Sequence, residues 1–255
     1  MNRREFAQLF AGAAAVRAVR GAAAAAAPAA DKPPAMSDAA RRLYASALVL
    51  DCNSAPPLAE RLPLPQADLD LVRASGIDVI KLSLGGINSD FAHTVSSIAQ
   101  VQQLIELHPD YFTAVRNAAD MARAKRERKL GIILSFESVE MLGGQLTAFE
   151  VFRNLGVRVM QLSYNRTSPF AAGVMEPKGG GLTPLGHEAV REMNRLGIAI
   201  DLSHANPPTH VLGLNEPRRM EIIADRLLKR GYSEAVTEKV LGANFARVLT
   251  QIWGS

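Results

Sequence analysis

Cysteine, aromatic residues and long apolar segments are scarce in this chain, and each scarcity excludes a class of protein. The single cysteine, Cys52, excludes an internal disulfide, so cysteine usage does not indicate the compartment. Aromatic residues make up 5% of the sequence, which argues against stacking platforms for nucleic-acid bases. Beyond residue 35, no segment approaches the roughly 18 consecutive apolar residues that a membrane-spanning helix needs.

Charge is also low. The formal net charge is +4, and part of it lies in the amino-terminal segment, so the charge gives little support for a nucleic-acid partner. A basic run over residues 123–129 is typical of a solvated helix face. What the chain does have is 255 residues that are 48% hydrophobic, which is enough for one sizeable α/β core. We therefore expect one domain over residues 36–255.

The amino-terminal segment, residues 1–35, does not have the pattern of a folded domain. Twin arginines, Arg3-Arg4, precede an apolar stretch, Phe6–Val16, and an alanine tract follows it. This pattern is typical of a twin-arginine export leader and predicts a periplasmic or secreted protein. Two further arginines interrupt the apolar stretch, so a disordered alanine-rich tail is the alternative.

A repeated unit organises the rest of the chain: a helix ends, a glycine follows, and an apolar β-branched run begins at once. The glycine suits the positive φ that often follows a helix, and such an apolar run suits a strand buried on both faces. With the run that starts at Leu48 and ends in Asp51-Cys52-Asn53, there are five such strands. The four strands after a glycine are Ile77–Ser83, Ile132–Glu137, Val157–Tyr164 and Ile198–His204. The repeat predicts a parallel α/β sheet of the TIM-barrel type, with its chemistry at the carboxyl ends of the strands.

Five strand units are too few for a closed barrel of this type, which has eight. The segment after His204, residues 205–215, is too short and too rich in proline to supply another parallel strand. The predicted fold is therefore an incomplete (β/α) barrel. Three explanations stay open: the missing strands come from another subunit, the sheet is open, or the chain is a deletion product that folds poorly.

Two residue types that bind metals lie at predicted strand tips. Glu137 ends the third strand and His204 the fifth, where barrel enzymes gather their reactive groups. Together they predict half of a metal site, with Glu137 also as the catalytic carboxylate. The alternatives are structural: Glu137 pairs with an arginine, and His204 bonds to backbone groups. Asp201, on the same strand as His204, is expected to be an interior acid with its own partners.

Three further polar residues fall at strand tips: Asn53, Tyr164 and Asn165. Amide and phenol groups orient a substrate through hydrogen bonds but rarely hold zinc. We expect these three side chains to bind substrate.

Several stretches resemble the membrane dipeptidase (renal dipeptidase) family of zinc peptidases, and the similarity covers most of residues 45–253. The stretches are LGVRVMQLSYNR at 155–166, GGLTPLGHEAVREMNRLG at 180–197, DLSH at 201–204, and the tail from RGYS at 230 to KVLGANFARVL at 239–249. The resemblance implies a TIM-like barrel with two zinc ions bridged by a glutamate, which hydrolyses dipeptides through a metal-activated water. In it, Glu137 matches the bridging glutamate and His204 matches one zinc histidine.

This chain departs from the family pattern at three places. Asn53 and Ala55 stand where the family has a His-x-Asp pair of ligands, and Tyr164 stands where it has a substrate-contacting histidine. After Thr209 the sequence passes almost directly to the tail. It thereby skips the family's second zinc histidine, its carboxylate-binding arginine and its catalytic aspartate. Two of five expected zinc ligands remain, so the resemblance predicts at most one zinc ion.

The sequence thus predicts a dipeptidase-like metallohydrolase that acts on small peptides, with no nucleic-acid partner and with homo-oligomerisation as a possibility. The first alternative is a non-catalytic pseudoenzyme or truncated remnant that acts at most as a binding module. The second is a barrel lyase or isomerase that uses Glu137 as a base, although the sequence offers it no partner acid.

Overall fold

The computed structural model describes residues 36–54, 56, 58–85, 89–176, 181–203 and 219–253, with the backbone alone at Asn53, Ser54 and Arg219. The predicted leader, residues 1–35, lies outside the described residues. Within the described part, no helix has the length and apolar character needed to cross a membrane.

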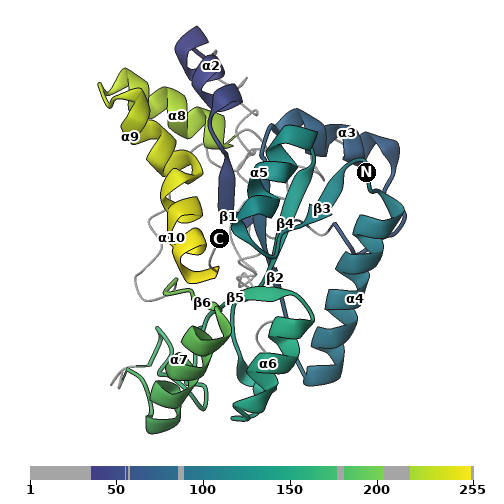
Figure 1. Cartoon of the computed structure of the whole chain (residues 1–255), viewed down its shortest axis with the longest axis vertical. Helices are drawn as coiled ribbons and strands as arrows, with labels where there is room; N and C mark the ends of the chain where they lie inside the picture. The colour runs from purple at the N-terminus through teal and green to yellow at the C-terminus, as the bar shows by residue number, and fades with distance from the viewer. Residues whose placement is uncertain are drawn as a thin grey trace, which may run out of the picture.

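Helices and strands alternate along most of the chain (Figure 1). The strands are β1 (Leu50–Ser54), β2 (Val79–Leu84), β3 (Phe112–Ala114), β4 (Leu130–Phe136), β5 (Val157–Met160) and β6 (Ala199–Ile200). The α-helices are α2 (Asp38–Ser46), α3 (Gln66–Ser75), α4 (Phe91–Leu107), α5 (Ala118–Glu127), α6 (Thr147–Asn154), α7 (Pro184–Leu196), α8 (Arg219–Lys229), α9 (Glu234–Glu238) and α10 (Asn244–Trp253). Two short elements, η1 (Glu140–Leu142) and η2 (Lys239–Ala243), complete the described secondary structure.

The strands form one parallel sheet in the order β1-β2-β4-β5-β6. β2 pairs with β4 along almost its whole length, from Val79 opposite Gly131 to Leu84 opposite Phe136. The other edge of β4 is shared: β3 pairs with its first half and β5 with its second half. The five predicted strand units are therefore the five strands of the main path, and β3 is a short addition to it.

An ion pair shows that this sheet is curled. Lys81 on β2 and Asp201 after β6 meet at 2.6 Å between Nζ and Oδ2, although β4 and β5 lie between their strands. Three strand spacings in a flat sheet amount to about 14 Å, which is more than these two side chains can bridge. The ion pair therefore crosses the concave side of a half-barrel. The expected incomplete TIM-barrel-like α/β fold is confirmed.

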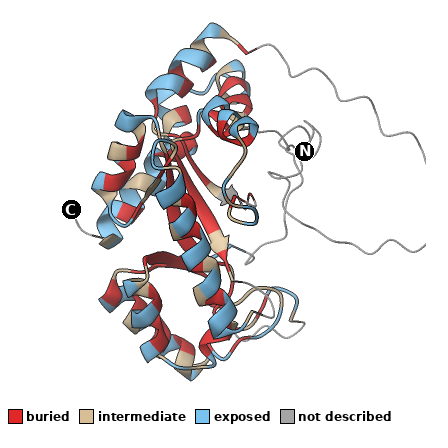
Figure 2. Cartoon of the chain, turned by 90° about the vertical axis from the view of Figure 1, so that its right-hand side faces the viewer, coloured by how far each residue is buried: buried red, intermediate tan, exposed pale blue. Residues whose placement is uncertain are grey.

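Each face of the half-barrel has its own hydrophobic core. The larger core includes Ile80, Ile132 and Met160 and packs against α3, α4, α6 and α7. The smaller core includes Val79 and Ile133, on the face that carries Lys81, and packs against α5 and α10. Figure 2 shows the buried strands running through the molecule between helices whose outer faces are exposed.

The carboxy-terminal helix α10 covers the open side of the half-barrel. In η2, just before α10, a Cβ atom on Gly242 would collide with the backbone oxygen of Leu48 and lie 2.9 Å from the amide nitrogen of Leu50, so only glycine allows this approach to β1. At its other end, the backbone oxygen of Ile252 lies 3.3 Å from the Cβ position of Gly197, just before β6. Helix α10 therefore runs from one edge strand to the other, as Figure 1 shows.

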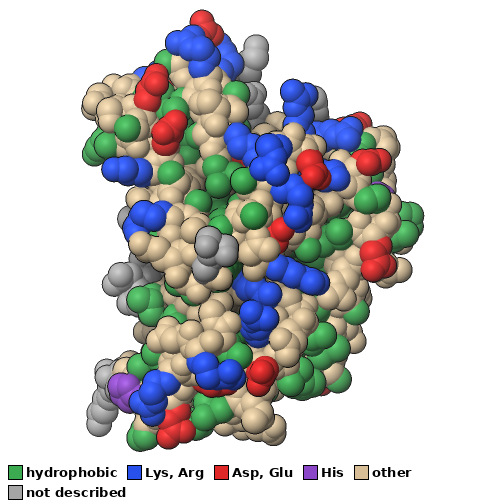
Figure 3. All heavy atoms as spheres, viewed as in Figure 1, with side chains coloured by type: hydrophobic (Ala, Val, Ile, Leu, Met, Phe, Trp, Pro, Cys, Tyr) green, Lys and Arg blue, Asp and Glu red, His purple; other side chains and the backbone are tan. Residues whose placement is uncertain are grey.

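The basic run on and after α5 contributes to the Lys and Arg side chains visible on one face in Figure 3. Several of these cations have carboxylate partners: Arg123 with Asp120, Lys125 with Asp78, and Lys129 with Glu127. Such pairing agrees with a solvated helix face, as the sequence indicated.

Helix boundaries follow the predicted caps at two places. The Ser37 hydroxyl accepts a hydrogen bond from the amide of Ala40 and begins α2. Thr183 accepts one from the amide of Gly186, with Pro184 as the first residue of α7. A side-chain oxygen before a helix satisfies an amide that has no partner inside the helix.

Three predictions about the strands were wrong. Gly131 does not end a helix: α5 ends at Glu127, Arg128 takes the left-handed conformation, and Gly131 lies inside β4. Glycine is needed there because a Cβ would lie 2.7 Å from Val115 and 3.1 Å from Ala124.

The predicted strands over 157–164 and 198–204 end early, at Met160 and Ile200, because the chain leaves the sheet for loops that make their own backbone bonds. Strand β3 was not predicted, since three residues are too short to show a period.

Candidate functional site

The carboxyl ends of the strands form the mouth of the half-barrel, and Glu137 lies there directly after β4. Glu137 is the first residue after the end of β4 at Phe136, where the chain bends away from the sheet. Its side chain is half-buried, and no described residue makes a hydrogen bond or an ion pair with it. This carboxylate is therefore available to a ligand at the mouth.

Tyr164 and Asn165 lie in the loop after β5. Burial and the nearby charge of Glu137 raise the pKa of Tyr164, so the phenol keeps its proton at neutral pH. The loop is fixed by two backbone bonds: the amide of Val174 donates to the oxygen of Tyr164, and the amide of Met175 donates to that of Asn165, each at 3.0 Å. The charge of Glu137 thus acts on the Tyr164 phenol, and Asn165 follows Tyr164 in sequence.

The other two predicted site residues cannot be placed in the same way. The backbone of Asn53 lies near the end of β1, at the same mouth, but its side chain is not described. His204 lies outside the described residues, as do Ala55 and residues 205–218.

Asp201 is an interior acid with its own partners, as the sequence indicated. Besides Lys81, it accepts hydrogen bonds from the amide and the hydroxyl of Ser203, at 2.8 and 2.5 Å. Burial alone would raise the pKa of Asp201, but Lys81 and the Ser203 donors outweigh burial and lower it. The carboxylate is therefore ionised at neutral pH. Its hydrogen bonds and its ion pair are made with Lys81 and Ser203.

The thiol of Cys52 lies close to this ion pair. Burial raises the pKa of the Cys52 thiol, and the negative charges of Asp51 and Asp201 act in the same direction, against the opposite effect of Lys81. A thiol that keeps its proton is a poor nucleophile at neutral pH.

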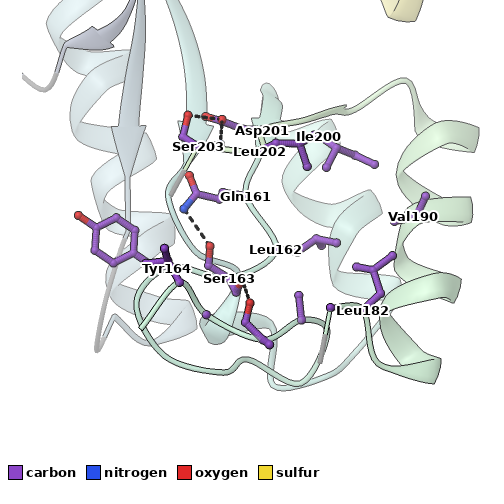
Figure 4. A pocket seen from close by; sticks show the side chains of 15 residues that line it. Gln161, Leu162, Ser163, Tyr164, Leu182, Val190, Ile200, Asp201, Leu202 and Ser203 are labelled. Atoms are coloured by element: carbon purple, nitrogen blue, oxygen red, sulfur yellow. Dashed lines mark hydrogen bonds between the residues drawn. The ribbon is translucent and has the colours of Figure 1, made fainter. Parts of the chain in front are cut away.

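A cavity of about 500 Å³ opens beside the mouth, under the loop that joins β5 to α7. Figure 4 shows its walls, where the side chains of Leu162, Leu182 and Val190 face one another across the apolar part. Gln161, Asp201 and Ser203 provide the polar part. A cavity of this size with few polar groups is typical of small-molecule sites.

The described donor set does not by itself fit a zinc ion. A catalytic zinc normally takes three protein ligands, and among the described residues no three His, Cys, Asp or Glu side chains form such a group. Glu137 is available, whereas Asp201 is engaged by Lys81 and Ser203. Any metal here needs further ligands from outside the described residues, and His204 is the predicted candidate.

Sequence reasoning missed two residues of this site, Lys81 and Gln161. Both have a signal in the sequence: each is a long polar side chain between apolar residues of a strand run, Lys81 between Ile80 and Leu82, and Gln161 between Met160 and Leu162. A lysine or glutamine in a run buried on both faces needs a partner, which marks it as structural or functional.

The amino-acid sequence was compared with protein-family models and with curated proteins, and both comparisons gave matches. A family model described as membrane dipeptidase (Peptidase family M19) matches residues 37–211. Dipeptidase tcpJ of Claviceps purpurea is 32% identical over 124 residues, which is 48% of this chain and 29% of that protein. An uncharacterized dipeptidase of Schizosaccharomyces pombe, C3A11.10c, is 30% identical over 118 residues, 46% of this chain and 29% of that protein. The chain thus spans about 30% of the length of these curated relatives.

Two crystal structures are similar in fold. An amidohydrolase from Pseudomonas aeruginosa superposes with a TM-score of 0.73 at 21% identity, covering 85% of this chain and 99% of the other. Dipeptidase AC, a metallopeptidase of family M19, gives a TM-score of 0.69 at 16% identity and covers 81% of this chain and 99% of the other. At these identities the likeness concerns the fold.

Proposed function

This chain belongs to the membrane dipeptidase family, peptidase family M19, and from that premise we propose that it is a dipeptidase-like metallohydrolase of low hydrolytic activity. The observation that carries the proposal is the half-buried carboxylate of Glu137 directly after β4, at the mouth of the half-barrel. In this proposal the substrate is a small peptide, and Asn53, Tyr164 and Asn165 line its cleft.

The proposed metal site is weak. Glu137 and His204 are two ligands, fewer than a catalytic zinc requires, so we expect at most one zinc ion at partial occupancy. When bound, zinc supplies a more acidic water and polarises a carbonyl group. The contributions of this chain's own residues are a carboxylate that can accept a proton and a neutral phenol that can donate a hydrogen bond to a substrate.

Metal content and hydrolysis together test the proposal. The full chain, purified with zinc, should retain substoichiometric zinc by mass spectrometry and cleave some members of a dipeptide panel slowly. Glu137→Gln and His204→Ala should each lower the zinc content, and Glu137→Gln should reduce cleavage by about a hundredfold because proton transfer is lost. Glu140→Gln, three residues beyond Glu137 and also half-buried, is the matched control and should change neither quantity. Zinc content that neither test substitution alters would contradict the proposal.

One observation favours a second candidate, a non-catalytic binding module. The interior acid of the mouth, Asp201, is neutralised by Lys81, while a cavity of about 500 Å³ beside it stays open. Dipeptide binding without any cleavage at saturating zinc would favour this candidate over the hydrolase.

We also propose that the chain is exported by its amino-terminal segment. The twin arginines and the apolar stretch of residues 1–35 support this localisation. Loss of export on Arg3→Lys/Arg4→Lys in the producing cell would support it, whereas unchanged export would contradict it.

A further inference from the structure

Arg158 is a mostly buried arginine whose partners in the described part of the chain are all backbone oxygens. The residue is 8% exposed. Its Nε atom donates to the oxygen of Arg116 at 2.8 Å, and its Nη1 atom donates to those of Arg153 and Val157 at 2.7 and 3.0 Å. Its Nη2 atom bonds to no described residue, yet it is not one of the buried atoms without a partner, so it is accessible to solvent. Two N–H groups of a fixed guanidinium therefore face outwards.

Arg158 lies at a gap in the sheet, where two strands share one edge of β4. Strand β3 pairs with β4 only as far as Ala114, and β5 begins to pair with it at Val157. Consecutive residues of β4 pair with Val157 and Val159, so Arg158 is an extra residue in this pairing, and such an irregularity re-aims a side chain. The guanidinium thereby reaches the backbone that follows β3. This position, at the start of β5, is away from the mouth, where the strands end.

Two further arginines lie around the same point. Arg116 is exposed, and its Nε and Nη2 atoms lie 3.5 and 3.8 Å from the Cβ position of Gly156. The backbone oxygen of Arg153 accepts from the amide of Gly156 as well as from Arg158. The half-buried side chain of Arg153 donates through Nε to the oxygen of Leu196 at 3.2 Å and keeps its Nη atoms free of described partners. The three arginines are therefore neighbours around Gly156.

Their positive charges are not cancelled by a carboxylate. Burial, together with the charges of Arg153 and Arg116, lowers the pKa of Arg158 to about 10, so this guanidinium is still protonated at neutral pH. Asp120 acts in the opposite direction, but its carboxylate pairs with Arg123 and accepts the backbone amide of Arg116. No ion pair between described residues includes any of the three arginines. In Figure 3, Lys and Arg side chains gather on the surface between α5 and α6.

The chemistry of this cluster favours a phosphate group over other anions. A phosphate group carries close to two negative charges at neutral pH and offers three strong acceptor oxygens. Guanidinium groups match those oxygens with paired N–H donors. A carboxylate carries one charge and two oxygens, so it would leave most of the excess positive charge in place.

We propose that Arg116, Arg153 and Arg158 bind a phosphate group, carried by inorganic phosphate or by a small phosphomonoester. The two outward N–H groups of Arg158 bind it at a fixed position, Arg116 provides a second pair of donors, and Arg153 adds positive charge. This site goes beyond the proposed hydrolase, because it lies away from Glu137, uses no metal and breaks no bond.

Titration calorimetry on the full chain tests the proposal with two phosphate probes, inorganic phosphate and glycerol 3-phosphate. A metal chelator is present, and sodium chloride keeps the ionic strength constant. One phosphate group should bind per chain, at least about tenfold more tightly than acetate. Tighter binding of glycerol 3-phosphate would assign the site to a phosphomonoester, and tighter binding of inorganic phosphate to the free ion. Absence of saturable binding by both phosphate probes, or affinity equal to that of acetate, would overturn the proposal.

Variants at an exposed position tie the binding to this cluster. Arg116→Gln should weaken phosphate binding by at least about tenfold, and Arg116→Lys, which keeps the charge but not the paired donors, should fall between Arg116→Gln and the unmodified chain. Arg42→Gln, at an exposed position on α2, removes the same charge far from β5 in Figure 1 and should bind phosphate normally. Arg158→Met would leave three backbone oxygens without their donor and can unfold the chain, so the Arg116 variants decide. Unchanged phosphate affinity in Arg116→Gln would also overturn the proposal.

One more variant separates this site from the proposed hydrolase. Glu137→Gln should lose zinc and cleavage but bind phosphate as the unmodified chain does. Loss of phosphate binding in Glu137→Gln would place the anion at the mouth and contradict the arginine site, whatever the outcome for hydrolysis.

Discussion

At the scale of single residues, the Lys81–Asp201 ion pair joins the two sides of the half-barrel. The side chains are 7% and 12% exposed, so each charge depends on the other for the solvation that it lost on burial. Removing one partner leaves an uncompensated buried charge. Lys81→Met should therefore lower the free energy of unfolding at pH 7 by about 3–5 kcal/mol, measured by urea denaturation. Lys81→Met/Asp201→Leu, which removes both charges, should recover most of that loss.

The pH dependence of the same variant follows from the pKa of Asp201. In the unmodified chain this pKa is lowered, so the carboxylate contributes stability above its ordinary value of about 4, and this stability is lost as pH falls through the folded value. In Lys81→Met, burial raises the pKa instead, and protonation relieves the unpaired charge. The stability difference between the two proteins should be largest near pH 7 and shrink as pH falls from about 5 to 3. Lys129→Met, which breaks the more exposed pair with Glu127, should show little difference at any pH.

At the scale of elements, helix α10 covers the concave core that a closed barrel would enclose with its own strands. Leu249 is 1% exposed in that core, whereas its neighbour Val248 is 38% exposed. Leu249→Ala should therefore cost about 2–5 kcal/mol of unfolding free energy, through the lost burial and the cavity that remains. Val248→Ala is the matched control and should change stability by less than about 1 kcal/mol. Equal effects of the two substitutions would show that α10 does not pack on the sheet through Leu249.

Elements were the part of this molecule best predicted from sequence, for a physical reason. Helix caps such as Ser37 and Thr183 act within four residues, and a buried strand shows itself in a continuous apolar run. The Lys81–Asp201 pair could not be predicted, because it joins positions 120 residues apart and depends on the curl of the sheet. The same holds for the three arginines around Gly156, since Arg116 joins the other two only through the pairing of β3 with β4. The predicted pair of metal ligands stays a prediction, since His204 lies outside the described residues.

At the scale of the whole molecule, the question is whether a half-barrel with five strands on its main path unfolds as one unit. Contacts that join distant parts of the chain favour a single unit. Helix α2, near the start of the described chain, bonds to α8 through the amide of Ser37 and Asp225, and the core under α10 includes residues of β1, β2, β4, β5 and β6. An independent carboxy-terminal unit would need a core of its own, whereas α10 shares its core with the sheet.

Trp253, the single tryptophan, makes this testable because it lies at the end of α10 and packs on the concave core, with its indole nitrogen buried. Its fluorescence therefore reports the docking of α10, while far-ultraviolet circular dichroism reports all helices. If the half-barrel is one cooperative unit, both signals should change at the same urea concentration with the same slope. A fluorescence transition at clearly lower urea would show that α10 leaves the open side of the sheet before the strands unfold. That result would favour the truncated-remnant interpretation, because the sheet would then keep its structure after the helix that covers its open side has left it.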